Sequence, residues 1–164
     1  MTVVAWDGTT LAADKQAAQA GCVYPVTKVF RIDDDRMAGI AGNLSRGVEI
    51  IEWLRANGAA EAFPKGSGDD EWVTCLVVHR SGTAQRYESR GTPFPIGETR
   101  HAIGSGRDFA TAAMHLGCSA EDAVKVAMCY SADCGIGIDA LVFAPSTAPR
   151  DDRRDHDRHP PRVV

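Results

Sequence analysis

The sequence predicts an α+β fold in which two antiparallel sheets stack on one another, with helices on the outside. Its 164 residues suffice for one domain with a sizeable core. Strand and helix patterns are clustered and do not alternate strictly, which favours antiparallel sheets. Several expected strands, among them "VVAW", "CLVV" and "ALVF", are apolar at nearly every position. Such strands are typically covered on both faces, which predicts the stacking.

Two hairpins are expected in the first quarter of the chain. Residues 2–6 and 9–13 flank an Asp-Gly pair, which is the strongest signal for a tight hairpin turn. Residues 27–32 and 36–42 flank the acidic turn at 33–35 in the same way. We therefore expect each of these two pairs to form antiparallel strands.

A helix over residues 43–57 should follow the second hairpin. Asn43 is a good N-cap residue, and Gly58 is expected to stop the helix. The loop at 59–71 comes next. Within the expected helix, apolar residues recur with the helical period, at Leu44, Val48, Ile51 and Leu54.

The second half predicts three more strands, two helices and a final strand. "WVTCLVVHR" and "AQRYES" surround the turn "SGT", which indicates a third hairpin, and "RHAIGSG" is a short strand that ends in glycines. An alanine-rich helix is expected at 107–117. "SAED" at 119–122 resembles a capping box and opens another helix to about Ser131. "IDALVF" at 138–143 is the last strand.

Composition excludes several classes of protein. The net charge of -4 gives no footprint for nucleic acid, and no apolar run approaches the roughly 20 residues of a membrane span. No secretory signal is visible, so we expect a cytoplasmic protein. The five cysteines are odd in number and form no CxxC pair, which indicates reduced thiols. We expect neither a cofactor nor a metal.

The domain is expected to cover residues 1–144, followed by a tail at 145–164. The tail is rich in Pro, Arg and Asp and has no apolar period, so it is predicted to be disordered or laid on the surface. His156 and His159 with nearby aspartates could bind a metal, but a solvated polyampholyte is the favoured interpretation.

Thr2 is the residue that offers chemistry. Aminopeptidases usually remove an initiator methionine that precedes a small side chain, and this would expose Thr2. A free α-amine has a pKa of about 7.7–8.0. It can accept the proton of its own hydroxyl, so that one residue supplies both nucleophile and base. This scheme needs a buried cation, a carboxylate to balance it, and backbone N–H groups for the oxyanion.

Suitable partners stand at consistent points of the predicted fold. A carboxylate follows the second strand, a lysine begins the third, and a glycine ends the fourth. A serine lies in a strand-to-helix turn, and a second aspartate precedes the last strand. Each is ordinary alone, as a turn residue or a solvated charge, and only the set points to catalysis. The set is Asp14, Lys28, Gly42, Ser105 and Asp133.

These residues resemble those of proteasome β-subunits, which are N-terminal-nucleophile (Ntn) hydrolases. The matching pieces are Thr2 with "LAAD", "TKVFRI", "MAGIAGN", "AIGSGRDFATAA" and "AMCYSADCGIGID", and the chain is closest to HslV-like subunits and bacterial proteasome homologues. The resemblance implies a four-layer αββα sandwich. It implies Thr2 as nucleophile, Asp14 and Lys28 as its charge partners, Gly42 as oxyanion donor, and Ser105 and Asp133 as supports of the amine.

The resemblance further implies a threonine-type endopeptidase subunit of a self-compartmentalising ring protease. Its partners would be copies of itself in stacked homo-oligomeric rings, peptide or unfolded-protein substrates, and an ATP-dependent unfoldase. Two alternatives remain open at this point: a non-catalytic structural ring subunit and a small-molecule Ntn amidase. Removal of Met1 is a prerequisite for either catalytic interpretation.

Overall fold

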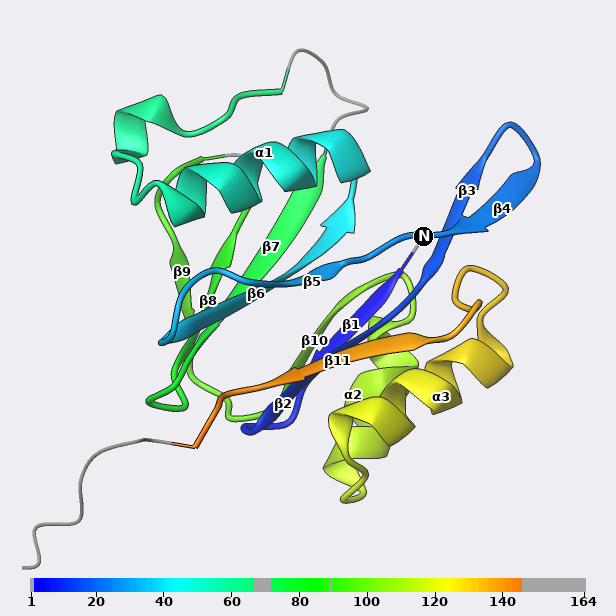
Figure 1. Cartoon of the computed structure of the whole chain (residues 1–164). Helices are drawn as coiled ribbons and strands as arrows, with labels where there is room; N and C mark the ends of the chain where they lie inside the picture. The colour runs from blue at the N-terminus through cyan, green and yellow to red at the C-terminus, as the bar shows by residue number, and fades with distance from the viewer. Residues whose placement is uncertain (1, 67–71, 89, 146–164) are drawn as a thin grey trace, which may run out of the picture.

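The computed structural model describes residues 2–66, 72–88 and 90–145. Within them the fold is mixed α/β, with three α-helices, two larger antiparallel sheets and a separate two-stranded hairpin. The predicted order of strands, helix, strands, two helices and strand is confirmed. Figure 1 shows the two larger sheets with α1 on one side and the α2–α3 pair on the other.

The first sheet has the strand order β10-β1-β2-β11, with every neighbour antiparallel. The expected hairpin forms: Val4 lies opposite Ala13 in β1 and β2. Its turn is closed by Asp7, whose Oδ1 accepts the N–H groups of Thr9 (2.9 Å) and Thr10 (2.8 Å). The strands are β1 (Val3–Trp6), β2 (Thr10–Asp14), β10 (His101–Gly104) and β11 (Ile138–Val142).

The second sheet runs in sequence order from β5 to β9, again antiparallel throughout. The two hairpins predicted for this part of the chain are both present. Its strands are β5 (Val29–Arg31), β6 (Arg36–Gly42), β7 (Val73–His79), β8 (Ala84–Tyr87) and β9 (Phe94–Ile96).

The helices begin where the capping residues predict. Asn43 Oδ1 accepts the N–H of Arg46 at 3.0 Å, and Ser119 Oγ accepts the N–H of Asp122 at 3.2 Å. The predicted end of the first helix was wrong. The helix stops at Arg55, and Asn57 adopts the left-handed conformation (φ +49°) expected of a residue that follows a helix. The helices are α1 (Leu44–Arg55), α2 (Arg107–His115) and α3 (Ala120–Tyr130), and a single 3₁₀ turn, η1 (Ala60–Ala62), follows α1.

The core lies in three clusters that alternate with the sheets. Val3 and Ala5 of β1 belong to the cluster beneath α2 and α3, whereas Val4 and Trp6 belong to the cluster between the two sheets. The outer face of the second sheet packs against α1, with Ile50 in the third cluster. The strands β1 and β7 are therefore covered on both faces, as the sequence predicts. For β11, which contains "ALVF", the prediction was wrong, because Ala140 and Val142 are exposed.

One hairpin in the first quarter of the chain was not predicted, and neither was β9, which pairs with β8. β3 (Gln16–Gln19) and β4 (Cys22–Pro25) pair with each other and turn through Ala20 and Gly21, both at positive φ. Their side chains are half-buried or exposed, so no apolar pattern reveals them. Figure 1 shows this hairpin extending past the ends of the two larger sheets, near the N-terminus.

Two predicted features extend beyond the described residues. The predicted loop at 59–71 is described only as far as residue 66. The predicted tail at 145–164 is described only at residue 145, so His156 and His159 lie outside the described residues. The described helices include none that is long and apolar enough to cross a membrane. Within the described ranges, no group of three or more His, Cys, Asp and Glu side chains is arranged to hold a metal.

Candidate active site

Thr2 lies directly before β1, and only 4% of its surface is exposed. The end of β10 crosses close to it at Gly104, which has φ +94°. A Cβ at Gly104 would collide with the carbonyl oxygen of Thr2. A glycine is therefore required here both for the backbone conformation and for the approach of Thr2.

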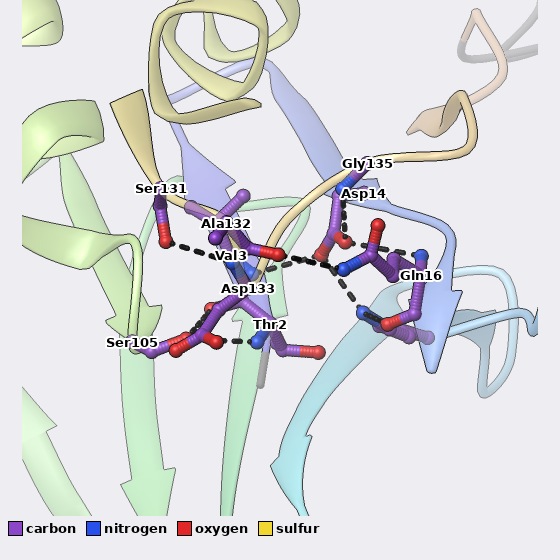
Figure 2. Close-up of polar contacts among 10 residues, drawn as sticks. Thr2, Val3, Asp14, Gln16, Ser105, Ser131, Ala132, Asp133 and Gly135 are labelled. Atoms are coloured by element: carbon purple, nitrogen blue, oxygen red, sulfur yellow. Dashed lines mark hydrogen bonds and ion pairs between the residues drawn. The ribbon is translucent and has the colours of Figure 1, made fainter. Parts of the chain in front are cut away.

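Ser105 holds the backbone of Thr2 from the turn between β10 and α2. The N–H of Thr2 donates to Ser105 Oγ at 3.0 Å, and the Ser105 hydroxyl donates to the carbonyl of Thr2 at 3.2 Å. The N–H of Gly106 also donates to this carbonyl, at 3.1 Å. Thr2 is thus fixed by the strand-to-helix turn that the sequence singles out (Figure 2).

Asp14, the last residue of β2, is fully buried and accepts four hydrogen bonds. Its Oδ1 accepts from the N–H of Val3 at 2.9 Å and from Lys28 Nζ at 2.8 Å. Its Oδ2 accepts from the N–H groups of Gln16 and Gly135, both at 3.0 Å. A buried carboxylate is costly unless its oxygens are paired, and here both are.

Lys28 is the cation beside Asp14, with 3% of its surface exposed. Besides the ion pair at 2.8 Å, its Nζ donates to the carbonyl of Gln16 at 2.6 Å. Burial lowers the pKa of Lys28, and the charge and hydrogen bond of Asp14 partly oppose this. The expectation that Lys28 begins a strand was wrong by one residue, because β5 begins at Val29.

A cavity of about 310 Å³ opens over Thr2 and Lys28. Gly42, the last residue of β6, lines it with φ +111°, and a Cβ there would collide with the carbonyl oxygen of Trp72. Ile40 and the β3–β4 hairpin form further walls. A larger cavity, about 910 Å³, is lined by Arg46, Phe63 and Trp72 but by no predicted site residue, so we place the site in the smaller one.

Asp133 lies in the segment between α3 and β11, as the sequence predicts. Its N–H donates to Ser131 Oγ at 3.3 Å. Figure 2 shows it next to Thr2 and Ser105. The structure thus brings all six predicted site residues into one region. Ser105 and Asp133 lie on one side of Thr2, the buried pair lies below the cavity, and Gly42 lies on its wall.

Three residues of this region were missed by the sequence analysis: Gln16, Gly104 and Gly135. Gly104 stands in the quoted "GSG" and Gly135 follows "SADC", so turn-forming glycines next to two candidate residues were the available signal. Gln16 had no such signal. Its role depends on the β3–β4 hairpin, which the pattern of apolar residues does not reveal.

No protein-family model and no curated protein sequence matches the chain. Solved structures do. The chain is similar to eukaryotic HslV from Trypanosoma brucei, at 20% identity over 86% of this chain and 97% of that one, with a TM-score of 0.64. It is also similar to BPH, a bacterial proteasome homologue, from Thiobacillus denitrificans, at 18% identity over 89% and 100% of the chains and a TM-score of 0.64. The same protein in complex with epoxomicin matches at 16% identity over 88% and 100%, with a TM-score of 0.63. The fold is therefore that of a proteasome-type Ntn hydrolase.

Proposed function

We propose that this chain is a threonine-type endopeptidase subunit of a self-compartmentalising ring protease, in which removal of Met1 exposes Thr2 as the nucleophile. The observation that carries the proposal is the buried Asp14–Lys28 pair beneath a Thr2 whose N–H is already held by Ser105. A buried ion pair is a poor way to stabilise a fold, so its position beside a nucleophile is better explained by chemistry.

In the first chemical step, the freed α-amine of Thr2 takes the proton from Oγ1, and Oγ1 attacks the carbonyl carbon of a peptide bond. Lys28 favours the neutral amine and the developing alkoxide by its positive charge. Asp14 balances that charge. Ser105 and Asp133 orient the amine.

In the second step, the tetrahedral oxyanion is stabilised by the N–H of Gly42, and the amine returns its proton to the leaving nitrogen. The C–N bond breaks and leaves an ester on Thr2. A water molecule, deprotonated by the same amine, then attacks this ester. The bond between the acyl carbon and Oγ1 breaks, the amine returns the proton to Oγ1, and the acid product leaves. No metal or cofactor is needed for these steps.

The remaining parts of the proposal rest on the similarity to the solved structures of HslV and BPH. The three core clusters support a four-layer αββα sandwich. Residues 1–144 would form the domain, since Arg80 Nη1 donates to the carbonyl of Ala144 at 2.6 Å, and residues 145–164 a tail. Stacked homo-oligomeric rings, peptide or unfolded-protein substrates, an unfoldase partner and a cytoplasmic location belong to the proposal as well.

The test combines intact mass with hydrolysis of a short fluorogenic peptide. The purified protein should have lost one methionine and should cleave the peptide, and epoxomicin should inhibit this cleavage. Thr2→Ala should lower the rate by at least ~10³-fold, whereas Thr2→Ser should retain activity.

Two results would contradict the proposal: retention of Met1, or equal rates for the wild type and Thr2→Ala. A retained methionine with assembled rings would favour the structural-subunit alternative. Thr2-dependent cleavage of small amides but not of peptides would favour the amidase.

A further inference from the structure

We propose that Gln16 is a positioning residue, which holds the loop at 131–137 against the Asp14–Lys28 pair and so sets the place of Asp133 beside Thr2. This inference rests on the proposed function. Gln16 lies on β3, part of the hairpin that the sequence did not reveal, and it is half-buried at the wall of the smaller cavity.

The backbone of Gln16 bridges the buried pair. Its N–H donates to Asp14 Oδ2 at 3.0 Å, and its carbonyl accepts from Lys28 Nζ at 2.6 Å. The Asp14 carboxylate and the Lys28 ammonium group are therefore both hydrogen-bonded to one peptide segment at the start of β3. Any movement of this segment would move both charges.

The side chain of Gln16 reaches in the other direction, to the loop. Its Nε2 donates to the carbonyl of Ala132 at 2.9 Å, and Ala132 directly precedes Asp133. Figure 2 shows this bond together with the contacts around Thr2. One residue thus links both charges of the pair to the residue before Asp133.

The loop is shaped to receive this side chain. A Cβ added at Gly135 would lie 2.5 Å from Gln16 Oε1, so a larger residue there would force the Gln16 amide to move. The N–H of Gly135 donates to Asp14 at 3.0 Å, and Lys15 N–H donates to the carbonyls of Gly135 (3.1 Å) and Gly137 (3.0 Å). Several hydrogen bonds therefore join the loop to residues 14–16. Among these bonds, the one from the Gln16 side chain lies nearest to Asp133 in the sequence.

Loss of this bond should affect catalysis more than folding. The Gln16–Ala132 bond is exposed to solvent, so the core does not depend on it. A misplacement of about 1 Å at a reacting group can cost on the order of 10²-fold in rate. Withdrawal of the Asp133 carboxylate would also remove a charge that favours the protonated α-amine, and so would lower the pKa of that amine.

The first experiment compares Gln16→Ala with the wild type. We expect kcat to fall by ~10- to 100-fold with KM little changed, and the acidic limb of the kcat/KM profile to move to lower pH. Hydrogen exchange in peptides covering 131–137 should become faster. Gln85→Ala is the matched control: its amide donates to Tyr87 Oη at 3.1 Å on β8, and it should change none of these quantities.

A double-mutant cycle with Gly135→Ala tests the contact itself. Gly135→Ala should lower kcat in the wild type because its methyl group displaces the Gln16 amide. It should cause little further loss in the Gln16→Ala background, where the amide is absent. Equal losses in both backgrounds would show that the two residues do not act together.

The outcomes separate this inference from the proposed function. If hydrogen exchange at residues 131–137 were unchanged in Gln16→Ala, Gln16 would not hold this loop in place, whatever the activity of the variant. Faster exchange with an unchanged kcat and pH profile would overturn its role in positioning. Peptide hydrolysis that survives Thr2→Ala would count against the proposed function alone, since the exchange measurement does not depend on Thr2.

Discussion

Single residues decide whether the site can form, and Asp14 shows why. Its two oxygens accept from Val3, Gln16, Gly135 and Lys28, so the carboxylate is fully paired although it is completely buried. Removing one member of a buried pair commonly costs about 3–5 kcal/mol, because the other is left as an unpaired charge. The site residues are thus also stability residues, and variants at Asp14 or Lys28 test both properties at once.

Gly104 allows a cleaner test at this scale. Gly104→Ala places a methyl group against the carbonyl of Thr2 and forces alanine into φ +94°. The conformation alone costs roughly 1–2 kcal/mol. We expect a larger loss of stability than that, together with loss of peptide hydrolysis, measured by urea unfolding and by the fluorogenic assay.

Gly82→Ala separates the two causes. Gly82 has a similar φ of +87°, but a Cβ there meets nothing within 4 Å. It should show the conformational cost only, with full activity. If both variants lost the same stability and Gly104→Ala kept its activity, the close approach of Gly104 to Thr2 would have no functional meaning.

At the scale of elements, α1 contains a charge that its packing does not explain. Arg46 is only 6% exposed, and no described group accepts a hydrogen bond from its Nη1. Its guanidinium lies over the ring of Phe63, 6.0 Å from the centroid. No carboxylate of the described residues pairs with Arg46. A buried cation without such a partner is costly, and an apolar side chain of similar length would avoid that cost.

We therefore expect Arg46→Met to leave the thermal midpoint unchanged or to raise it, as measured by scanning calorimetry. Arg55→Met on the same helix is the control. Arg55 is exposed and pairs with Glu52 at 2.7 Å, an interaction worth little, so its loss should shift the midpoint only slightly. A midpoint lowered by many degrees in Arg46→Met would mean that Arg46 has a stabilising partner.

The elements also show where sequence reasoning succeeds. The Asp-Gly turn, the Asn43 cap and the Ser119 cap are local signals, and the structure confirms all three. The six candidate site residues meet because they stand at ends of those elements. The β3–β4 hairpin was missed since its exposed side chains follow no apolar period, and Gln16 was missed with it. Contacts between segments far apart in sequence, such as Gln16 with Ala132, have no local signal at all.

At the scale of the whole molecule, half-buried histidines couple folding to pH. Burial lowers the pKa of His101, and the Arg86 guanidinium lowers it further. Burial, helped by Arg36, also lowers the pKa of His79. Below the ordinary histidine pKa of about 6.5, these two histidines therefore bind more protons in the unfolded chain than in the folded one. Stability must then fall as the pH decreases through this range.

We expect the urea midpoint of the wild type to fall between pH 7.5 and 5.5. The double variant His79→Gln/His101→Gln should lose much of this slope. His115→Gln, at the exposed end of α2, serves as the control and should keep the slope of the wild type. If the urea midpoint of the double variant fell with pH as steeply as that of the wild type, groups other than His79 and His101 would be responsible for the pH dependence.

The four bonds to Asp14 also govern when activity can arise during synthesis. Its partners Val3, Gln16 and Lys28 emerge from the ribosome early, but Gly135 belongs to the segment made shortly before the last strand. Contacts between distant parts of a chain form late in folding, because a long loop must close first. A nascent or half-folded chain therefore contains Thr2 without its complete surroundings. If the proposed function holds, the protein has a built-in delay, which protects the ribosome and neighbouring chains from premature cleavage.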